Sequence, residues 1–175
     1  SFEAKNLSRS DVSADASKGD VGIGLKTFIE GNGKTFQKVA EFNKDRGLYK
    51  GADPKEIIYT VSKLRNKRIE TTKRIHKLDS IIYHCVTRSP NKMGFYELNM
   101  DLVQEDSIKD ITPDNNTIKF TDGLNEYSFN ISKSTLYKRF ITPDDIVQFD
   151  VRILADPFDT LEHLLEGEVQ LDDLE

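Results

Sequence analysis

The chain has 175 residues, of which 37% are hydrophobic, and this is enough to bury the core of one folded domain. It contains no run of eighteen apolar residues and no signal peptide at its start, so we expect a cytoplasmic protein with no membrane partner. The single cysteine, Cys85, excludes an internal disulfide and cannot form a zinc site by itself.

The first predicted element is a β-hairpin. Residues 10–16 and 21–29 alternate polar with small or apolar positions, and Lys18-Gly19 supplies a turn dipeptide between them. With this dipeptide at the tip, Asp11 lies opposite Lys26, and one face of the hairpin carries Asp11, Ser13, Asp15, Gly22, Gly24 and Lys26. Carboxylates, an ammonium group and two glycines on one face leave room for a metal ion and a phosphate. The alternative is an ordinary cross-strand ion pair on the surface.

Two helices are predicted next. After a turn at 31–33, residues 35–43 predict a short helix on which Gln37 and Glu41, four residues apart, share a face. Asp53 followed by proline is a good N-cap for a longer helix that ends near residue 77.

The longer helix is strongly basic. Its apolar positions form a stripe, and we expect the basic side chains to lie mostly off it: Lys63, Arg65, Lys67, Arg68, Lys73 and Arg74. Such a helix can lie along DNA phosphates, with Thr71 and Thr72 as further contacts, or it can simply be a long solvated helix.

The second half predicts a sheet. Strands are expected at 80–88, 94–103, 116–120, 125–130 and 146–154, with Asp122-Gly123 as a hairpin signal. Cys85 is predicted to be buried core, and His84 lies on the opposite face of the same strand, so the two do not form a catalytic dyad.

A short helix is predicted at 133–140, exposing Lys133, Lys138 and Arg139 either for phosphate binding or as part of a capped connector. We expect one domain over 1–160 and an acidic tail or linker over 161–175, which could lead to a further domain.

Several segments carry a resemblance to a known family. Ser10-Asp-Val-Ser-Ala-Asp15 and Gly22-Ile-Gly-Leu-Lys-Thr-Phe28 resemble the catalytic hairpin of the type II restriction endonucleases in the PD-(D/E)xK nuclease superfamily, and residues 31–43, 65–75, 83–87 and 127–140 extend the similarity. The resemblance implies an α/β fold with a mixed central β-sheet flanked by helices. It also implies Mg²⁺-dependent hydrolysis of phosphodiester bonds in double-stranded DNA, with Asp11 as a metal ligand and Lys26 as the motif lysine. Many such enzymes are dimers, so a homodimer is one expectation.

The motif departs from the superfamily at one position. An acid normally stands two residues before the lysine, and here that residue is Gly24. A second carboxylate for Mg²⁺ could come from Asp15, from Glu41 assisted by Gln37, or from Glu3, and we prefer Glu41 with Gln37. We interpret Lys38 as a surface charge that could reach a phosphate.

The net charge of −5 conceals an uneven distribution. Residues 34–92 contain 15 Lys or Arg against 6 Asp or Glu, whereas the rest of the chain contains 10 against 24. This asymmetry predicts a basic face for a polyanion. Besides the nuclease, two other functions remain open, namely a DNA-recognition domain without catalysis and a protein-interaction domain with an acidic partner.

Overall fold

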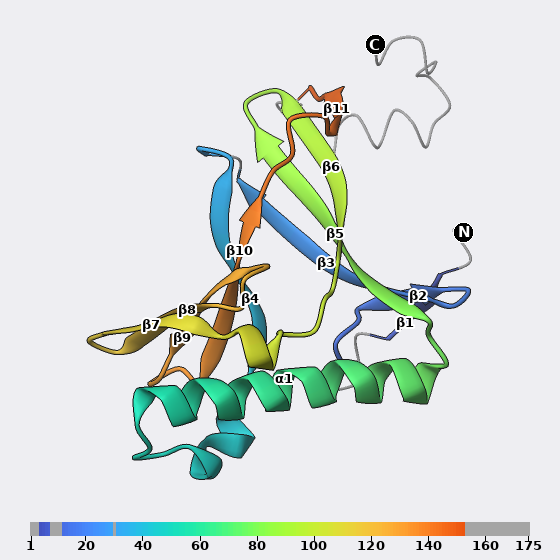
Figure 1. Cartoon of the computed structure of the whole chain (residues 1–175). Coiled ribbons are helices and arrows are strands. Elements are labelled where there is room, and N and C mark those ends of the chain that lie inside the picture. The colour runs from blue at the N-terminus through green and yellow to red at the C-terminus, as the bar shows by residue number, and fades with distance from the viewer. Residues whose placement is uncertain (1–3, 8–11, 30, 153–175) are drawn as a thin grey trace, which may run out of the picture.

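The computed structural model describes residues 4–7, 12–29 and 31–152, and this part of the chain forms a mixed α/β fold (Figure 1). It contains a six-stranded sheet, a five-stranded sheet and the helix α1, which lies along one side of both sheets. The expected α/β class is confirmed. The strands are divided between two sheets, however, where the sequence predicted one central sheet.

The six-stranded sheet contains the lysine strand of the predicted hairpin. Its strands β3 and β5 are parallel neighbours, and all other neighbours are antiparallel. In spatial order the strands are β1 (Lys5–Asn6), β2 (Ala16–Lys18), β3 (Val21–Ile29), β5 (Ser80–Ser89), β6 (Lys92–Asn99) and β11 (Val147–Asp150).

The five-stranded sheet is antiparallel throughout. In spatial order its strands are β4 (Lys34–Glu41), β10 (Thr135–Ile141), β9 (Glu126–Asn130), β8 (Thr117–Thr121) and β7 (Lys109–Asp114). The predicted hairpin at Asp122-Gly123 joins β8 to β9: Gly123 adopts φ +83°, and the Asp122 carboxylate accepts hydrogen bonds from the backbone N–H groups of Leu124 and Asn125.

Helix α1 (Pro54–His76) begins as the sequence predicts. The Asp53 carboxylate accepts hydrogen bonds from the N–H groups of Lys55 (2.9 Å) and Glu56 (3.1 Å), and Lys77 ends the helix with φ 55°. The buried residues follow helical spacing along one side: Ile57, Ile58, Val61, Ser62, Arg65, Asn66, Ile69 and Thr72.

This buried side of α1 connects two hydrophobic cores. Ile57, Ile58 and Val61, near its start, pack against the five-stranded sheet, whereas Ile69 packs against the six-stranded sheet. Two 3₁₀ helices, η1 (Asn43–Leu48) and η2 (Glu105–Ser107), complete the described elements. Cys85 is fully buried, as predicted, and burial raises the pKa of its thiol to about 11.

The two short helices predicted from the sequence are wrong. Residues 35–43 lie mainly in β4 and residues 133–140 mainly in β10, and these two strands pair with each other from Glu41 opposite Thr135 to Lys34 opposite Ile141. Both segments mix helix-forming and strand-forming residues, so the ladder between them, about a hundred residues apart in sequence, decides their conformation.

The register of the first hairpin is also wrong. The pairs are Ala16 with Ile23, Ser17 with Gly22 and Lys18 with Val21, so the turn lies at Gly19-Asp20, and β2 begins only at Ala16. Gly19 has φ +58°, which makes it the residue that turns the chain. The shift of the tip by one residue changes every predicted cross-strand pair.

Among the described helices, α1 is the longest, and neither it nor the others have the length and apolar character that a membrane-crossing helix needs.

Candidate functional site

A cavity of about 730 Å³ lies where β3, β4, η1 and α1 approach one another. Four of its side chains are basic and two are acidic. The cavity is lined by Leu25, Lys26, Thr27, Gln37, Lys38, Val39, Ala40, Glu41, Asn43, Lys44, Asp45 and Arg68. The predicted residues Lys26, Gln37 and Glu41 therefore meet at one cavity, although Gln37 and Glu41 stand on a strand and not on the predicted helix.

Lys26 reaches this cavity from β3. Its Nζ donates a hydrogen bond of 2.8 Å to the backbone carbonyl of Lys38 on β4, and the side chain is half-buried. Burial lowers the pKa of Lys26 below its usual value, the positive charges of Arg65 and Lys38 lower it further, and the negative charge of Asp15 opposes them. Lys26 is therefore fixed by its backbone contact in a partly desolvated position.

Glu41 is held by two neighbours. Its carboxylate accepts hydrogen bonds from Lys38 Nζ and from Asn43 Nδ2. The hydrogen bond and charge of Lys38 lower the pKa of Glu41, and Asn43 and Arg68 add to this effect. Glu41 is therefore an ionised carboxylate whose two oxygens face donors.

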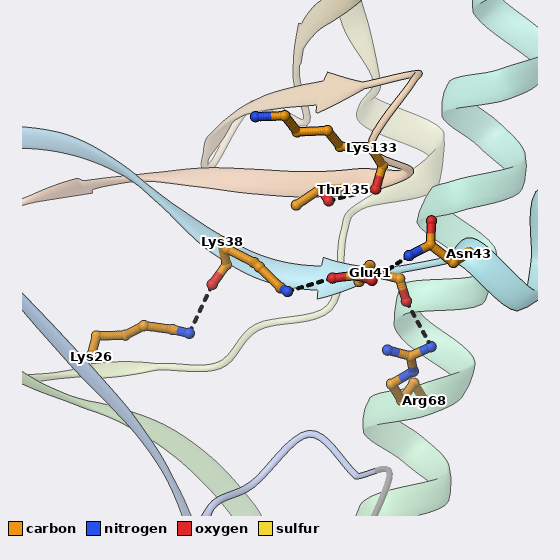
Figure 2. A network of polar contacts seen from close by, with 7 residues as sticks. All are labelled: Lys26, Lys38, Glu41, Asn43, Arg68, Lys133 and Thr135. Carbon is orange, nitrogen blue, oxygen red and sulfur yellow. Dashed lines mark hydrogen bonds and ion pairs between the residues drawn. The ribbon is translucent and has the colours of Figure 1, made fainter.

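Arg68 links α1 to the end of β4. Its Nη2 donates a hydrogen bond of 3.1 Å to the Glu41 carbonyl, and its guanidinium lies 5.2 Å from the ring centroid of Phe42. Figure 2 shows the resulting line of contacts from Lys26 through Lys38 and Glu41 to Arg68 and Asn43. Gln37 contributes its amide beside this line, donating from Nε2 to Thr35 Oγ1 at 2.9 Å. Local pattern gave no sign that Asn43 and Lys44 would line the same cavity.

The predicted open space around the glycines of β3 is filled. A Cβ at Gly22 would come 2.8 Å from Leu78 Cδ1, and one at Gly24 would come 2.8 Å from Met100 Cε. The expectation that these glycines leave room for a metal ion and a phosphate is therefore wrong, because core side chains occupy that face.

The predictions for the two acids of the first hairpin, Asp15 and Asp11, have different outcomes. Asp15 Oδ2 accepts a hydrogen bond of 2.7 Å from the Leu25 N–H, and Asp15 is not among the residues that line the cavity. Asp11 lies outside the described residues, as does Glu3. The predicted pairing of Asp11 with Lys26 thus stays a prediction, although the register that suggested it is not the observed one.

The donor atoms at the cavity suit a hard cation only in part. The Glu41 carboxylate and the Gln37 amide offer oxygen ligands of the kind that Mg²⁺ prefers. Within 4–7, 12–29 and 31–152, however, no three His, Cys, Asp or Glu side chains are grouped closely enough to hold a metal ion. A magnesium site here would need another carboxylate, and Asp11 is the residue that the sequence predicts for it.

The predicted DNA contacts fall into two groups. Lys63, Lys67, Arg74 and Lys133 are exposed, and Arg68, Lys73 and Arg139 are partly buried. Arg65 and Lys138 are buried, with 3% and 6% of their surface exposed, so they are not the surface contacts that the sequence predicted.

The positions of Arg65 and Lys138 on the backbone explain why the prediction of surface contacts is wrong for them. Arg65 falls on the regular buried stripe of α1, and Lys138 points inward from β10, which the sequence had assigned to a helix. Thr72 is buried as well: its Oγ1 donates to the Arg68 carbonyl and accepts from the Ser13 N–H, so it is not free to contact phosphate.

The chain was compared with known protein families, curated proteins and solved structures. Neither a protein-family model, nor a curated protein, nor a solved structure matches the chain.

Proposed function

We propose that the chain is a nuclease of the type II restriction endonuclease kind, hydrolysing phosphodiester bonds in double-stranded DNA at the cavity between β3, β4 and α1. The observation that carries this proposal is the meeting of Lys26, Gln37 and Glu41 around one cavity. The sequence predicted Lys26 on a strand and Gln37 with Glu41 on a helix, whereas all three stand on strands, β3 and β4, around the same cavity. The restriction-endonuclease form of the α/β fold is part of the same proposal.

The basic side chains at the cavity bind the DNA backbone. Lys38, Lys44 and Arg68 place positive charge beside the space in which a phosphate would lie. Lys26, already held by the Lys38 carbonyl, directs its ammonium group toward negative charge that develops on the phosphoryl oxygens. Water adds to phosphorus and one P–O ester bond breaks, which yields a phosphate monoester and an alcohol that takes a proton from the water.

Glu41 and Gln37, with Asp11, would hold Mg²⁺. When bound, this ion polarises a phosphoryl oxygen and lowers the pKa of a coordinated water. Lys38 and Asn43 orient the Glu41 carboxylate and favour its ionised form.

Plasmid cleavage with Mg²⁺ tests this function. Lys26→Ala and Glu41→Gln should each lower the cleavage rate by about a hundredfold or more, because each removes a group that acts on the reacting phosphate or its cation. Lys34→Ala is the matched control, since Lys34 is exposed at the start of β4 and does not line the cavity. Cleavage by Lys26→Ala at the wild-type rate would remove Lys26 from the mechanism.

A second function, DNA recognition without catalysis, is favoured by two observations. The described residues lack a group of three metal ligands, and Gly24 occupies the position where the superfamily has an acid. A protein of this kind would bind duplex DNA with steep salt dependence but would not cut it with Mg²⁺, whereas Lys38→Ala and Arg68→Ala would reduce the salt slope. Binding without cleavage by the wild-type protein would therefore replace the nuclease with this function.

A further inference from the structure

The two faces of the six-stranded sheet differ in how far they are buried. On β5, Ile81, Tyr83 and Cys85 point into the hydrophobic core that the sheet shares with α1. Side chains alternate between the faces along a strand, so the even-numbered residues of β5, from Ser80 to Arg88, belong to the other face. We call the face that carries these even-numbered residues the outer face.

The strand registers align the residues of the outer face in rows. Two rows, each with one member from β3, β5, β6 and β11, are Thr27, Val86, Phe95 and Val147, and Ile29, Arg88, Met93 and Phe149. The rings of Phe95 and Phe149 meet edge to face with their centroids 5.5 Å apart, which agrees with their place on one face. Six of these eight residues are apolar, so the outer face is hydrophobic over four adjacent strands.

The outer face leaves large apolar side chains in contact with water. Eight large hydrophobic side chains of the described part of the chain are exposed, and four of these lie on the outer face, each with more than half of its surface exposed: Leu25, Ile29, Val147 and Phe149. Contiguous exposed apolar surface of this kind marks a place where another element packs.

The sequence that follows β11 has the character of such an element. Residues 153–175 lie outside the described residues, but their sequence repeats the Asp-Pro pair that begins α1, here as Asp156-Pro157, and Gly167 is a typical residue after a helix end. Between these signals, apolar residues recur at helical spacing at Phe158, Leu161 and Leu165, while Asp159, His163 and Glu166 fall on the other side. The pattern predicts an amphipathic helix.

The segment begins within reach of the outer face. The Val151 N–H donates a hydrogen bond of 2.9 Å to the Asn91 carbonyl, so the chain leaves β11 beside the β5–β6 turn, next to the second row. Only residues 153–155 separate Arg152 from Asp156, and they can span about 10 Å. A helix over 157–166 is about 15 Å long, and the distance from β11 to β3 is about 14 Å, at about 4.8 Å between neighbouring strands. The helix is therefore long enough to cross all four strands.

We propose that residues 156–166 pack as an amphipathic helix on the outer face, with their apolar side against the two rows. Charge favours this occupant, because the segment has four acidic residues and no Lys or Arg, while Arg88 in the second row forms no ion pair with an acid of the described residues. The packing gives the six-stranded sheet a helix on each face. Residues 161–166 then belong to the folded domain and not to the acidic tail predicted over 161–175. The inference is independent of the proposed nuclease function.

A single tryptophan tests this packing in the full chain, which contains no tryptophan of its own. In Phe158→Trp the indole replaces an aromatic ring on the apolar side of the segment, so it should be buried against the sheet. His163→Trp is the matched control on the polar side. The Phe158→Trp protein should emit at shorter wavelength than the His163→Trp protein, and acrylamide should quench it several-fold less.

A charge on the outer face should release the segment. Val147→Glu, introduced into Phe158→Trp, should shift the emission to longer wavelength and raise acrylamide quenching to the level of His163→Trp, because a carboxylate covered by apolar side chains is unfavourable. Ile75→Glu is the control, since Ile75 and Val147 are both 60% exposed and Ile75 belongs to α1, on the core side of the sheet. Phe149→Glu is the second variant if Val147→Glu does not fold, as judged by circular dichroism.

Three results overturn the packing. The first is equal emission and quenching at positions 158 and 163, and the second is a protected Phe158→Trp that responds to neither Val147→Glu nor Phe149→Glu. The third is protection that disappears on dilution together with a dimer detected by light scattering, which assigns the outer face to a second copy of the chain. These measurements use neither DNA nor Mg²⁺, so their failure leaves the nuclease proposal intact, and absence of plasmid cleavage leaves the packing intact.

Discussion

The charged groups at the cavity edge and those in the interior differ in what surrounds them. At the edge, Lys38 and Glu41 pair with each other while 57% and 40% of their side chains are exposed. In the interior, Arg65, Lys138 and Asp122 are almost completely buried. Arg65 and Asp122 form a few specific hydrogen bonds, whereas Lys138 Nζ lies over the rings of Tyr83 and Phe140. Charged side chains at the edge are therefore solvated by water, whereas those in the interior depend on protein contacts.

Electrostatic screening explains the difference. Water screens an exposed ion pair and solvates each partner if the other is removed, so such pairs contribute little to stability. A buried charge has no such replacement, and the loss of its partner leaves the full cost of desolvation. We therefore expect interior substitutions to change folding stability, and edge substitutions to change ligand binding.

The largest effect is expected at Asp122. Its buried carboxylate accepts hydrogen bonds from Gln104, Leu124 and Asn125 N–H groups and from the Tyr127 hydroxyl. Asp122→Ala leaves these donors unpaired and should lower the free energy of unfolding by about 3 kcal/mol. Urea denaturation measures this loss.

Asp114→Ala is the control for Asp122. Asp114 is 57% exposed and lies 3.7 Å from Lys119 Nζ. Its removal should change stability by less than about 0.5 kcal/mol. Similar losses for the two variants would show that burial does not separate the two regions.

A smaller loss is expected for Tyr83→Phe. The substitution removes the acceptor of Arg65 Nη2 and leaves the buried guanidinium with fewer partners. It should lower the free energy of unfolding by about 1–3 kcal/mol. Tyr137→Phe, in the partly buried face of β10, is the matched control, and an equal cost there would contradict the role of the Arg65 contact.

The stability at alkaline pH is expected to depend on Lys138. Burial lowers the pKa of Lys138 in the folded chain below its usual 10.5, so the unfolded chain holds this proton up to a higher pH. The cost of the buried charge is fully present below the folded pKa and disappears as pH rises from there toward 10.5. The stability of the wild type relative to Lys138→Met should therefore rise with pH.

Urea unfolding of both proteins between pH 7 and pH 10 checks this difference. The comparison with Lys138→Met is needed because Cys85, whose pKa is raised to about 11, destabilises both folded proteins at alkaline pH. A difference that stays constant with pH would show that Lys138 titrates alike in the folded and unfolded chains.

The smallest effect is expected at the cavity edge in acid. Lys38 lowers the pKa of Glu41 in the folded chain below its usual 4.5, so the Glu41 contribution is present above pH 4.5 and is lost as pH falls through the folded value. Glu41→Gln should remove only this slight acid dependence and leave stability at pH 7 nearly unchanged. A large loss of stability at pH 7 would show that Glu41 stabilises the fold as strongly as the interior charges do.

Elements whose signals lie within a few neighbouring residues followed from the sequence. Asp53 capping α1 and the turn at Asp122-Gly123 are local hydrogen-bond and backbone effects, which is why both occur where the sequence predicts them. The β-branched and aromatic residues of segment 80–88 likewise predicted β5 and the burial of Cys85. Lys26 followed from the hairpin pattern, whereas the choice of Glu41 with Gln37 for the missing acid depended on the resemblance, and local pattern alone did not bring these residues together.

Tertiary structure alone decided the conformation of β4 and β10 and the burial of Arg65 and Lys138. The two strands find each other across about a hundred residues, and nothing within either segment specifies that partner. Arg65 and Lys138 look like surface cations by residue type, but the helix phase and the strand pairing turn them inward. The sequence by itself therefore determined the helix cap and the hairpin turn, because residues close in sequence make those contacts. The packing of distant segments determined which charged side chains are exposed to water.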